Sequence, residues 1–448
     1  MAGPLLIVIN CPQFGRLIPY GAHCLHRLVL ASELVDGINW IQSTLLMSHV
    51  IRALKQTLLP VFFCPFLPDQ TEVSRHVTRL KQAIIDEDVD LTVLSALFEL
   101  LTACAVILFN SPCAQLTEEE QSQLDELFRT GLVNLFTALV AYWPCECCRQ
   151  KHFGSPDPDN WMVKDDAPCG TLWNELDEEV IYTSEIILRC AFLLSTRSKK
   201  ACQRLFVFHE DLARVLIQFS LSITQCRSTT LPSLTTKCVI YALRLLGRIF
   251  SASNPHRLSC STDSNLMIQS TTRLACWLSC HMDWSLCAAE VCSTLANSVA
   301  YLTPCIVSLW GEVDKPISQS LLTRCILPSL NSSVACGEAL RLICNMFTVA
   351  HHTTTVPISN LCWSHPVGRE LLLRLDRFAR ELDTLRPYLP SPSSEPDWML
   401  CSTRQLFKLC ELFLNCAHTD KQLIDLLSSV LPTLYDFCTR LDRGTAIG

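Results

Sequence analysis

The stretch LPSLNSSVACGEALRLICNMFTV, Leu327–Val349, decides the fold, because a variant of it occurs earlier in the chain. The earlier copy, Leu231–Ala252, reads LPSLTTKCVIYALRLLGRIFSA. The proline recurs after 96 residues (328 minus 232) and the Ala-Leu-Arg-Leu phrase after 97 (339 minus 242), so we expect a turn between the two phrases to absorb the difference. Helical repeats of solenoid proteins are often about 40 to 47 residues long. The spacing therefore predicts two consecutive repeats, each slightly longer than this.

Both copies carry apolar residues at the spacing of an α-helix. These residues recur at i, i+3 and i+7, which places them on one helical stripe. Pro328 lacks a backbone N–H, so we expect it to end or kink the helix before it, and Ser332 or Ser333 is a suitable N-cap for the next helix. Each copy is therefore predicted as a helix, a corner and a second helix. The stripe residues are Leu340, Ile343 and Phe347 in the later copy and Leu243, Leu246 and Phe250 in the earlier one.

The apolar skeleton between Trp173 and Phe437 resembles that of armadillo and HEAT proteins, whose repeats are recognised by such patterns. Midway between the two copies, Ala289, Cys292 and Leu295 repeat the spacing. The resemblance implies an all-α fold, an armadillo/HEAT-like α-solenoid of stacked helical pairs. We expect N-terminal helical repeats over residues 1–150, a surface loop over 151–171, central helical repeats over 172–385, a Pro/Ser-rich loop over 386–398 and C-terminal helical repeats over 399–448.

The composition favours helices and a protein without strong charge. The chain has 448 residues, 13 glycines and a net charge of −7. Glycine at about 3%, against a usual ~7%, leaves little material for Gly-rich nucleotide-binding turns or for all-β folds. The mild negative charge gives no long-range attraction of the whole molecule to nucleic acid. A possible basic patch remains at Arg197, Lys199, Lys200 and Arg204, which is typical of either a nucleic-acid contact or a solvated helix end.

The 27 cysteines are spread along apolar helix faces, for example at Cys190, Cys292, Cys344 and Cys410. Disulfide frameworks are typical of small secreted proteins, so we interpret these thiols in a long chain as reduced and largely buried. The first residues, MAGPLLIVINCPQFGRL, have no basic segment before a short apolar run, which predicts neither a secretory signal nor an anchor. We expect an intracellular protein, nuclear or cytoplasmic.

Two groups of cysteine and histidine have residue types that bind metals. His23, Cys24 and His26 lie close together in the sequence, and we interpret them as a packing or capping set. The second group surrounds a Pro, Gly and Asp-rich loop and could close a tetrahedral zinc site. Its spacing is C-x-C-C rather than C-x2-C, so free thiols at a helix end are the alternative, and we expect no metal or other cofactor. This second group consists of Cys145, Cys147, Cys148, His152 and Cys169.

The segment Leu91–Phe109, LTVLSALFELLTACAVILF, is nearly long enough to cross a bilayer. Glu99 lies in its middle, and the acidic run Asp86–Asp90 precedes it. A solenoid helix that is buried on most sides has the same composition. We favour this interpretation and expect no membrane.

The sequence contains none of the short catalytic motifs G-x-x-x-x-G-K-[ST], G-x-G-x-x-G, H-E-x-x-H or G-x-S-x-G. We therefore predict that the chain is not an enzyme but a scaffold or adaptor for protein–protein interactions, because stacked repeats build extended binding surfaces. Two alternatives from other classes stay open: a solenoid that binds nucleic acid through the basic patch, and a membrane-associated helical protein.

The stretches LPSLNSSVACGEALRLICNMF and QLFKLCELFLNCAHTD also resemble the meiosis inhibitor family of vertebrate armadillo-type solenoids. Those proteins are associated with forming the double-strand breaks of meiotic recombination. The resemblance implies that the chain is a fragment or isoform of a longer protein. It also implies work in the nucleus through protein partners, with nucleic acid reached only indirectly or through the basic patch.

Overall fold

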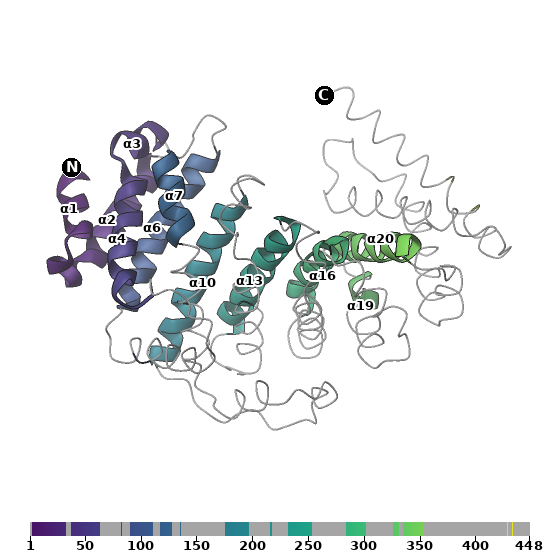
Figure 1. Cartoon of the computed structure of the whole chain (residues 1–448). Coiled ribbons are helices and arrows are strands. Elements are labelled where there is room, and N and C mark those ends of the chain that lie inside the picture. Colours follow the sequence, from purple (N-terminus) through teal and green to yellow (C-terminus); the bar gives the residue numbers. More distant parts are fainter. Residues whose placement is uncertain are drawn as a thin grey trace, which may run out of the picture. The chain divides into compact units, whose positions relative to one another are not determined.

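A computed structural model of the chain describes mainly helices (Figure 1). No strand occurs among the described residues, so the all-α prediction is confirmed for them. The chain divides into two compact units, Met1–Ala252 and Ser253–Gly448, and each is described by itself. The loops expected at 151–171 and 386–398 lie outside the described residues. The structure describes residues 2–32, 37–62, 82, 90–110, 117–127, 135, 175–196, 216, 232–252, 284–301, 326–330, 335–353, 428 and 432.

The first unit begins with a group of short helices. Helix α3 (Gly37–Ser43) ends where the hydroxyls of Ser43 and Thr44 donate hydrogen bonds to the carbonyl of Trp40. Leu45 then takes a positive φ of 51°. Such a conformation marks a turn, because a side chain rarely adopts it inside a helix. The elements of this group are α1 (Ala2–Asn10), η1 (Pro12–Leu17), α2 (Ile18–Ser32), α3 (Gly37–Ser43) and α4 (Leu46–Phe62).

The central helix of the first unit is α6 (Leu91–Asn110). It starts at Asp90, whose carboxylate accepts hydrogen bonds from the backbone N–H groups of Thr92 and Val93, as an N-cap does. It packs against α2, α4 and α10 (Glu175–Thr196). Over Leu91–Leu108 this helix is the one in the described part that is long and apolar enough to cross a membrane, yet 83% of that window is buried inside the protein. Packing against neighbouring helices therefore accounts for its apolar character.

Helix α7 (Glu118–Glu126) begins with a capping box. The Thr117 hydroxyl accepts a hydrogen bond from the backbone N–H of Glu120, and the Glu120 carboxylate accepts one from the backbone N–H of Thr117. Three glutamates in the first turn also suit the positive end of the helix dipole. The same Glu120 accepts a hydrogen bond from the Ser48 hydroxyl, which attaches α7 to α4.

The earlier copy of the repeated phrase forms α13 (Pro232–Ala252), which packs against α10 (Figure 1). The Cys238 thiol donates to the carbonyl of Ile181, and the Arg244 guanidinium lies 5.6 Å from the ring centroid of Phe192. We predicted a turn between the Leu-Pro-Ser-Leu and Ala-Leu-Arg-Leu phrases. This prediction is wrong for the earlier copy, because one continuous helix runs from Pro232 through the second phrase. Proline is well tolerated in the first helical turn, where its missing N–H would have no intrahelical partner.

The later copy lies in the second unit, in α19 (Leu327–Leu330) and α20 (Cys336–Thr353). Pro328 lies in the first turn of α19, while Ser332, Ser333 and residues 321–325 of the helix predicted before it lie outside the described residues. Helix α20 packs against α16 (Trp284–Tyr301), and the Asn345 side-chain amide donates to the carbonyl of Ala296. A helix, α16, therefore lies where the intervening repeat was predicted, near Ala289.

The two copies bury corresponding positions along their helices. Residues 238–248 of α13 correspond to residues 335–345, which are Ala335 and the first part of α20, at the 97-residue offset of the Ala-Leu-Arg-Leu phrase. The burial class is the same at all but two of these eleven pairs. The side chains of Phe250 and Phe347 lie outside the described part. The predicted stripe is confirmed at four positions, each at most 1% exposed: Leu243, Leu246, Leu340 and Ile343.

Candidate functional site

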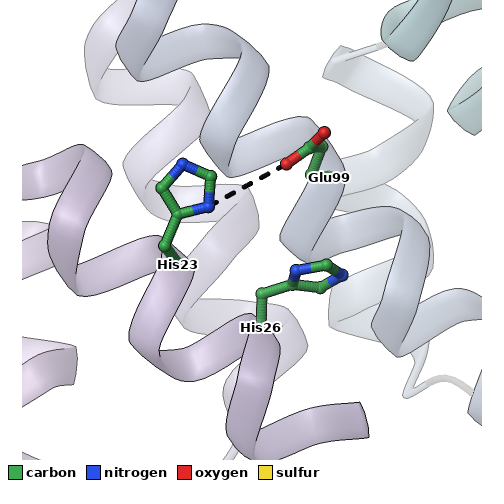
Figure 2. Close-up of side chains that lie close together, drawn as sticks. All are labelled: His23, His26 and Glu99. Atoms are coloured by element: carbon green, nitrogen blue, oxygen red, sulfur yellow. Dashed lines mark ion pairs between the residues drawn. The ribbon is translucent and has the colours of Figure 1, made fainter.

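Two histidines of α2 and one glutamate of α6 meet where these helices pack together (Figure 2). His23 and His26 are three residues apart, so their imidazoles project from the same side of α2. Glu99 lies opposite them, with its Oε2 atom 4.0 Å from Nδ1 of His23. One potential ligand atom from each of the three residues lies within 4.8 Å of the other two. We call these three residues the His–Glu cluster.

The Glu99 carboxylate is held from its other side by α10. The Tyr182 hydroxyl donates a hydrogen bond of 2.9 Å to Oε1 of Glu99. The Glu99 side chain is 19% exposed, whereas that of His23 is 56% exposed. The carboxylate is therefore positioned by a neighbouring helix, while one of the two imidazoles facing it has room to rotate.

Charged groups of α10 surround the cluster. Arg189 places its Nε atom 3.7 Å from Oε1 of Glu185, one helical turn earlier. Burial lowers the pKa of His26, Glu99 raises it, and His23 and Arg189 lower it further. Burial also raises the pKa of Tyr182, and its hydrogen bond to the Glu99 carboxylate raises it as well, so the hydroxyl keeps its proton and acts as a donor. The lowered pKa favours the neutral form of the His26 imidazole, which is the form that binds metals.

The residue types of the His–Glu cluster suit a metal ion such as zinc, which binds both nitrogen and oxygen ligands. Two imidazoles and one carboxylate are the protein ligands of several zinc sites, in which a fourth position is left for water or substrate. The Glu99 carboxylate also has a simpler role, because it accepts the hydrogen bond from Tyr182 that links α6 to α10. At 4.0 Å, the contact between His23 and Glu99 is too long for a direct hydrogen bond.

The sequence grouped the two histidines with Cys24, but the structure groups them with Glu99. Cys24 is exposed and does not belong to the cluster. Glu99 is distant in sequence, and its only signal there was its position as a charge inside an otherwise apolar helix. Tyr182 carried no signal, because the packing of α10 on α6 is needed to bring its hydroxyl to the carboxylate.

The other candidate sites from the sequence cannot be placed. The possible zinc ligands Cys145, Cys147, Cys148, His152 and Cys169 all lie outside the described residues. The possible basic patch, Arg197 to Arg204, also lies outside them and begins just after α10 ends at Thr196.

Comparison of the chain with protein-family models, curated proteins and solved structures finds no match.

Proposed function

We propose that the chain is a non-enzymatic α-solenoid scaffold of the armadillo/HEAT type, which holds other proteins in a complex. The observation that carries this proposal is the shared burial pattern of residues 238–248 and 335–345, 97 positions apart. Two copies of one repeat unit are expected to bury corresponding positions along their helices. Repeat proteins do so because each unit packs on its neighbours in the same way.

A second observation concerns the arginine of the Ala-Leu-Arg-Leu phrase, which contacts an earlier helix of the chain in each copy. Arg244 of α13 lies over the ring of Phe192 in α10. Arg341 of α20 donates to the Asn297 side chain and to the Ser293 carbonyl in α16. The two residues correspond at the 97-residue offset (341 minus 244). Corresponding arginines thus both contact a packed helix, through a ring in one copy and through hydrogen bonds in the other, which supports a repeated structural unit.

For the biological setting we propose a nuclear complex of meiotic recombination, in which the chain acts through protein partners during double-strand break formation. This part of the proposal follows from the resemblance of two stretches to meiosis inhibitor protein 1. The first of these stretches includes α19 and much of α20, and the second lies outside the described residues.

Small-angle X-ray scattering tests the architecture. A compact globule of this length would have a radius of gyration of about 22 Å. A solenoid is extended, so we expect a clearly larger value with a long tail in the distance distribution. A radius near that of the globule would contradict the solenoid.

Affinity purification from meiotic cells tests the function. The full chain, carrying a tag, is expected to co-purify defined nuclear proteins at constant ratios. The variant for comparison is Ile343→Ala. Ile343 is fully buried, so its truncation should disrupt the repeat and release those proteins. Recovery of the same proteins with both forms, or of none with the parent, would contradict a scaffold built on these repeats.

A further inference from the structure

We propose that His23, His26 and Glu99 form a binding site for a divalent cation of the zinc type, which joins α2 to α6. The inference does not depend on the scaffold function, because it concerns the local contact of two helices in the first unit.

The geometry is close to that of a bound ion. Zinc bonds to nitrogen and oxygen of about 2.0 to 2.1 Å separate the ligand atoms of a tetrahedral site by roughly 3.4 Å. The cluster has its ligand atoms within 4.8 Å of one another, and Oε2 of Glu99 is already 4.0 Å from Nδ1 of His23. Rotation of the His23 side chain, which is 56% exposed, can shorten its separations from Glu99 and His26 without moving the helix backbone.

The surroundings supply an outer shell for this site. Carboxylates that bind metals are usually hydrogen-bonded on their other oxygen, which fixes their orientation. Tyr182 has this role for Glu99, because its hydroxyl donates a hydrogen bond to Oε1 while Oε2 faces His23. The nearby positive charge of Arg189 opposes a cation, and Glu185, 3.7 Å from it, offsets part of that charge.

The choice of cation follows from the donor atoms. Magnesium and calcium prefer sites made of oxygen ligands, whereas imidazole suits zinc and its neighbours in the first transition row. Three protein ligands leave one position of a tetrahedral ion for water, which can reach the site beside the exposed imidazole of His23.

Zinc titration of the full chain tests the proposal. Accessible thiols are first alkylated under native conditions, because thiolates bind zinc strongly and would hide a histidine site. Zinc ion alone is then titrated in a calorimeter into the parent and into His23→Gln, Glu99→Gln and Tyr182→Phe. His49→Gln is the matched control, since its half-buried imidazole on α4 lies outside the cluster.

We expect one zinc site in the parent and in His49→Gln, and its loss in His23→Gln and Glu99→Gln. Tyr182→Phe removes only the outer-shell hydrogen bond, so the affinity should fall by about 10- to 100-fold. His23→Gln is the deciding variant because the replaced side chain is 56% exposed, so we expect the fold to be retained. Zinc should also raise the melting temperature of the parent and not that of this variant. Equal zinc affinity in the parent and in His23→Gln, or no zinc binding by the parent, would overturn the proposal.

Discussion

The Tyr182 hydroxyl on α10 donates a hydrogen bond of 2.9 Å to Oε1 of Glu99 on α6. The carboxylate that receives this bond faces His23 of α2 with its second oxygen. One side chain of the central helix thus faces polar groups from two of its neighbours, α2 and α10. Glu99, which interrupts an apolar helix in the sequence, brings polar atoms of α2, α6 and α10 together.

Replacement of Tyr182 by phenylalanine should weaken this connection. The variant loses one hydrogen bond to a charged acceptor, and because the site is half-exposed, water can take over part of it. We expect the free energy of unfolding to fall by about 1 kcal/mol in urea denaturation without zinc. Tyr20→Phe is the control, since Tyr20 is 70% exposed. Equal stability of the Tyr182 variant and the parent would show that this hydrogen bond does not hold α10 on α6.

Truncation of corresponding core residues should destabilise both copies of the repeat. Leu246 and Ile343 are fully buried, and removing a large buried side chain typically costs about 2 to 5 kcal/mol. We expect Leu246→Ala and Ile343→Ala to lose helical circular dichroism at clearly lower urea concentrations than the parent. Lys237→Ala, on the exposed side of α13, should change the unfolding free energy by at most about 0.5 kcal/mol. If only one of the two core variants is destabilised, the two positions are not equivalent.

Arg341 should be important for the contact between α16 and α20. Its guanidinium donates to Oε2 of Glu338 at 2.7 Å, to Oδ1 of Asn297 at 2.7 Å and to Oγ of Ser293 at 2.9 Å. Arg341→Met retains an apolar stem but removes these bonds, so we expect a loss of about 1 to 3 kcal/mol in chemical denaturation. Arg341→Lys restores the charge without the planar fork and should recover only part of this loss. Full recovery would mean that charge alone matters.

Buried thiols should be inert in the native chain. Burial raises the pKa of Cys190 to about 12 and also raises the pKa of Cys104 and of Cys238, so almost no thiolate forms near neutral pH. Alkylation followed by peptide mass spectrometry should label the exposed Cys24 quickly and these three only after denaturation. Labelling of Cys190 at the rate of Cys24 would contradict the packing of α10 on α6.

Glu185 should make the stability of the first unit depend on pH. Burial raises its pKa above 4.5, although the positive charges of Arg189 and Lys237 lower it. A raised carboxyl pKa means that the folded chain holds the proton more tightly than the unfolded chain. This contribution to stability is complete below pH 4.5 and is lost as the pH rises through the folded pKa.

Glu185→Gln stays neutral at every pH, so it should melt at or above the temperature of the parent near neutral pH. The difference should shrink as the pH is lowered toward the carboxyl pKa. Glu178→Gln, an exposed position on the same helix, is the control. A variant that melts below the parent at neutral pH would show that the ion pair with Arg189 outweighs the effect of burial.

The sequence by itself determined that this protein is helical and which residues form its local cores. Apolar residues at helical spacing have to be buried together, so the stripe through Leu340 and Ile343, and its counterpart 97 residues earlier, followed from periodicity alone. The capping box at the start of α7 also depends on nearby residues alone, because Thr117 and Glu120 satisfy each other's backbone groups within one turn. The turn expected after Pro232 was wrong because proline is tolerated in the first turn of a helix as well as in a corner.

Only the tertiary structure decided which polar residues meet. Glu99 lies 73 residues after His26 (99 minus 26), and Tyr182 lies 83 residues after Glu99. Helix periodicity shows which face of each helix is apolar, but it does not show which helices become neighbours or how far one is shifted along another. The packing of α2 and α10 on α6 sets both, and it places two imidazoles and a tyrosine hydroxyl around a carboxylate that the sequence presented as an isolated charge.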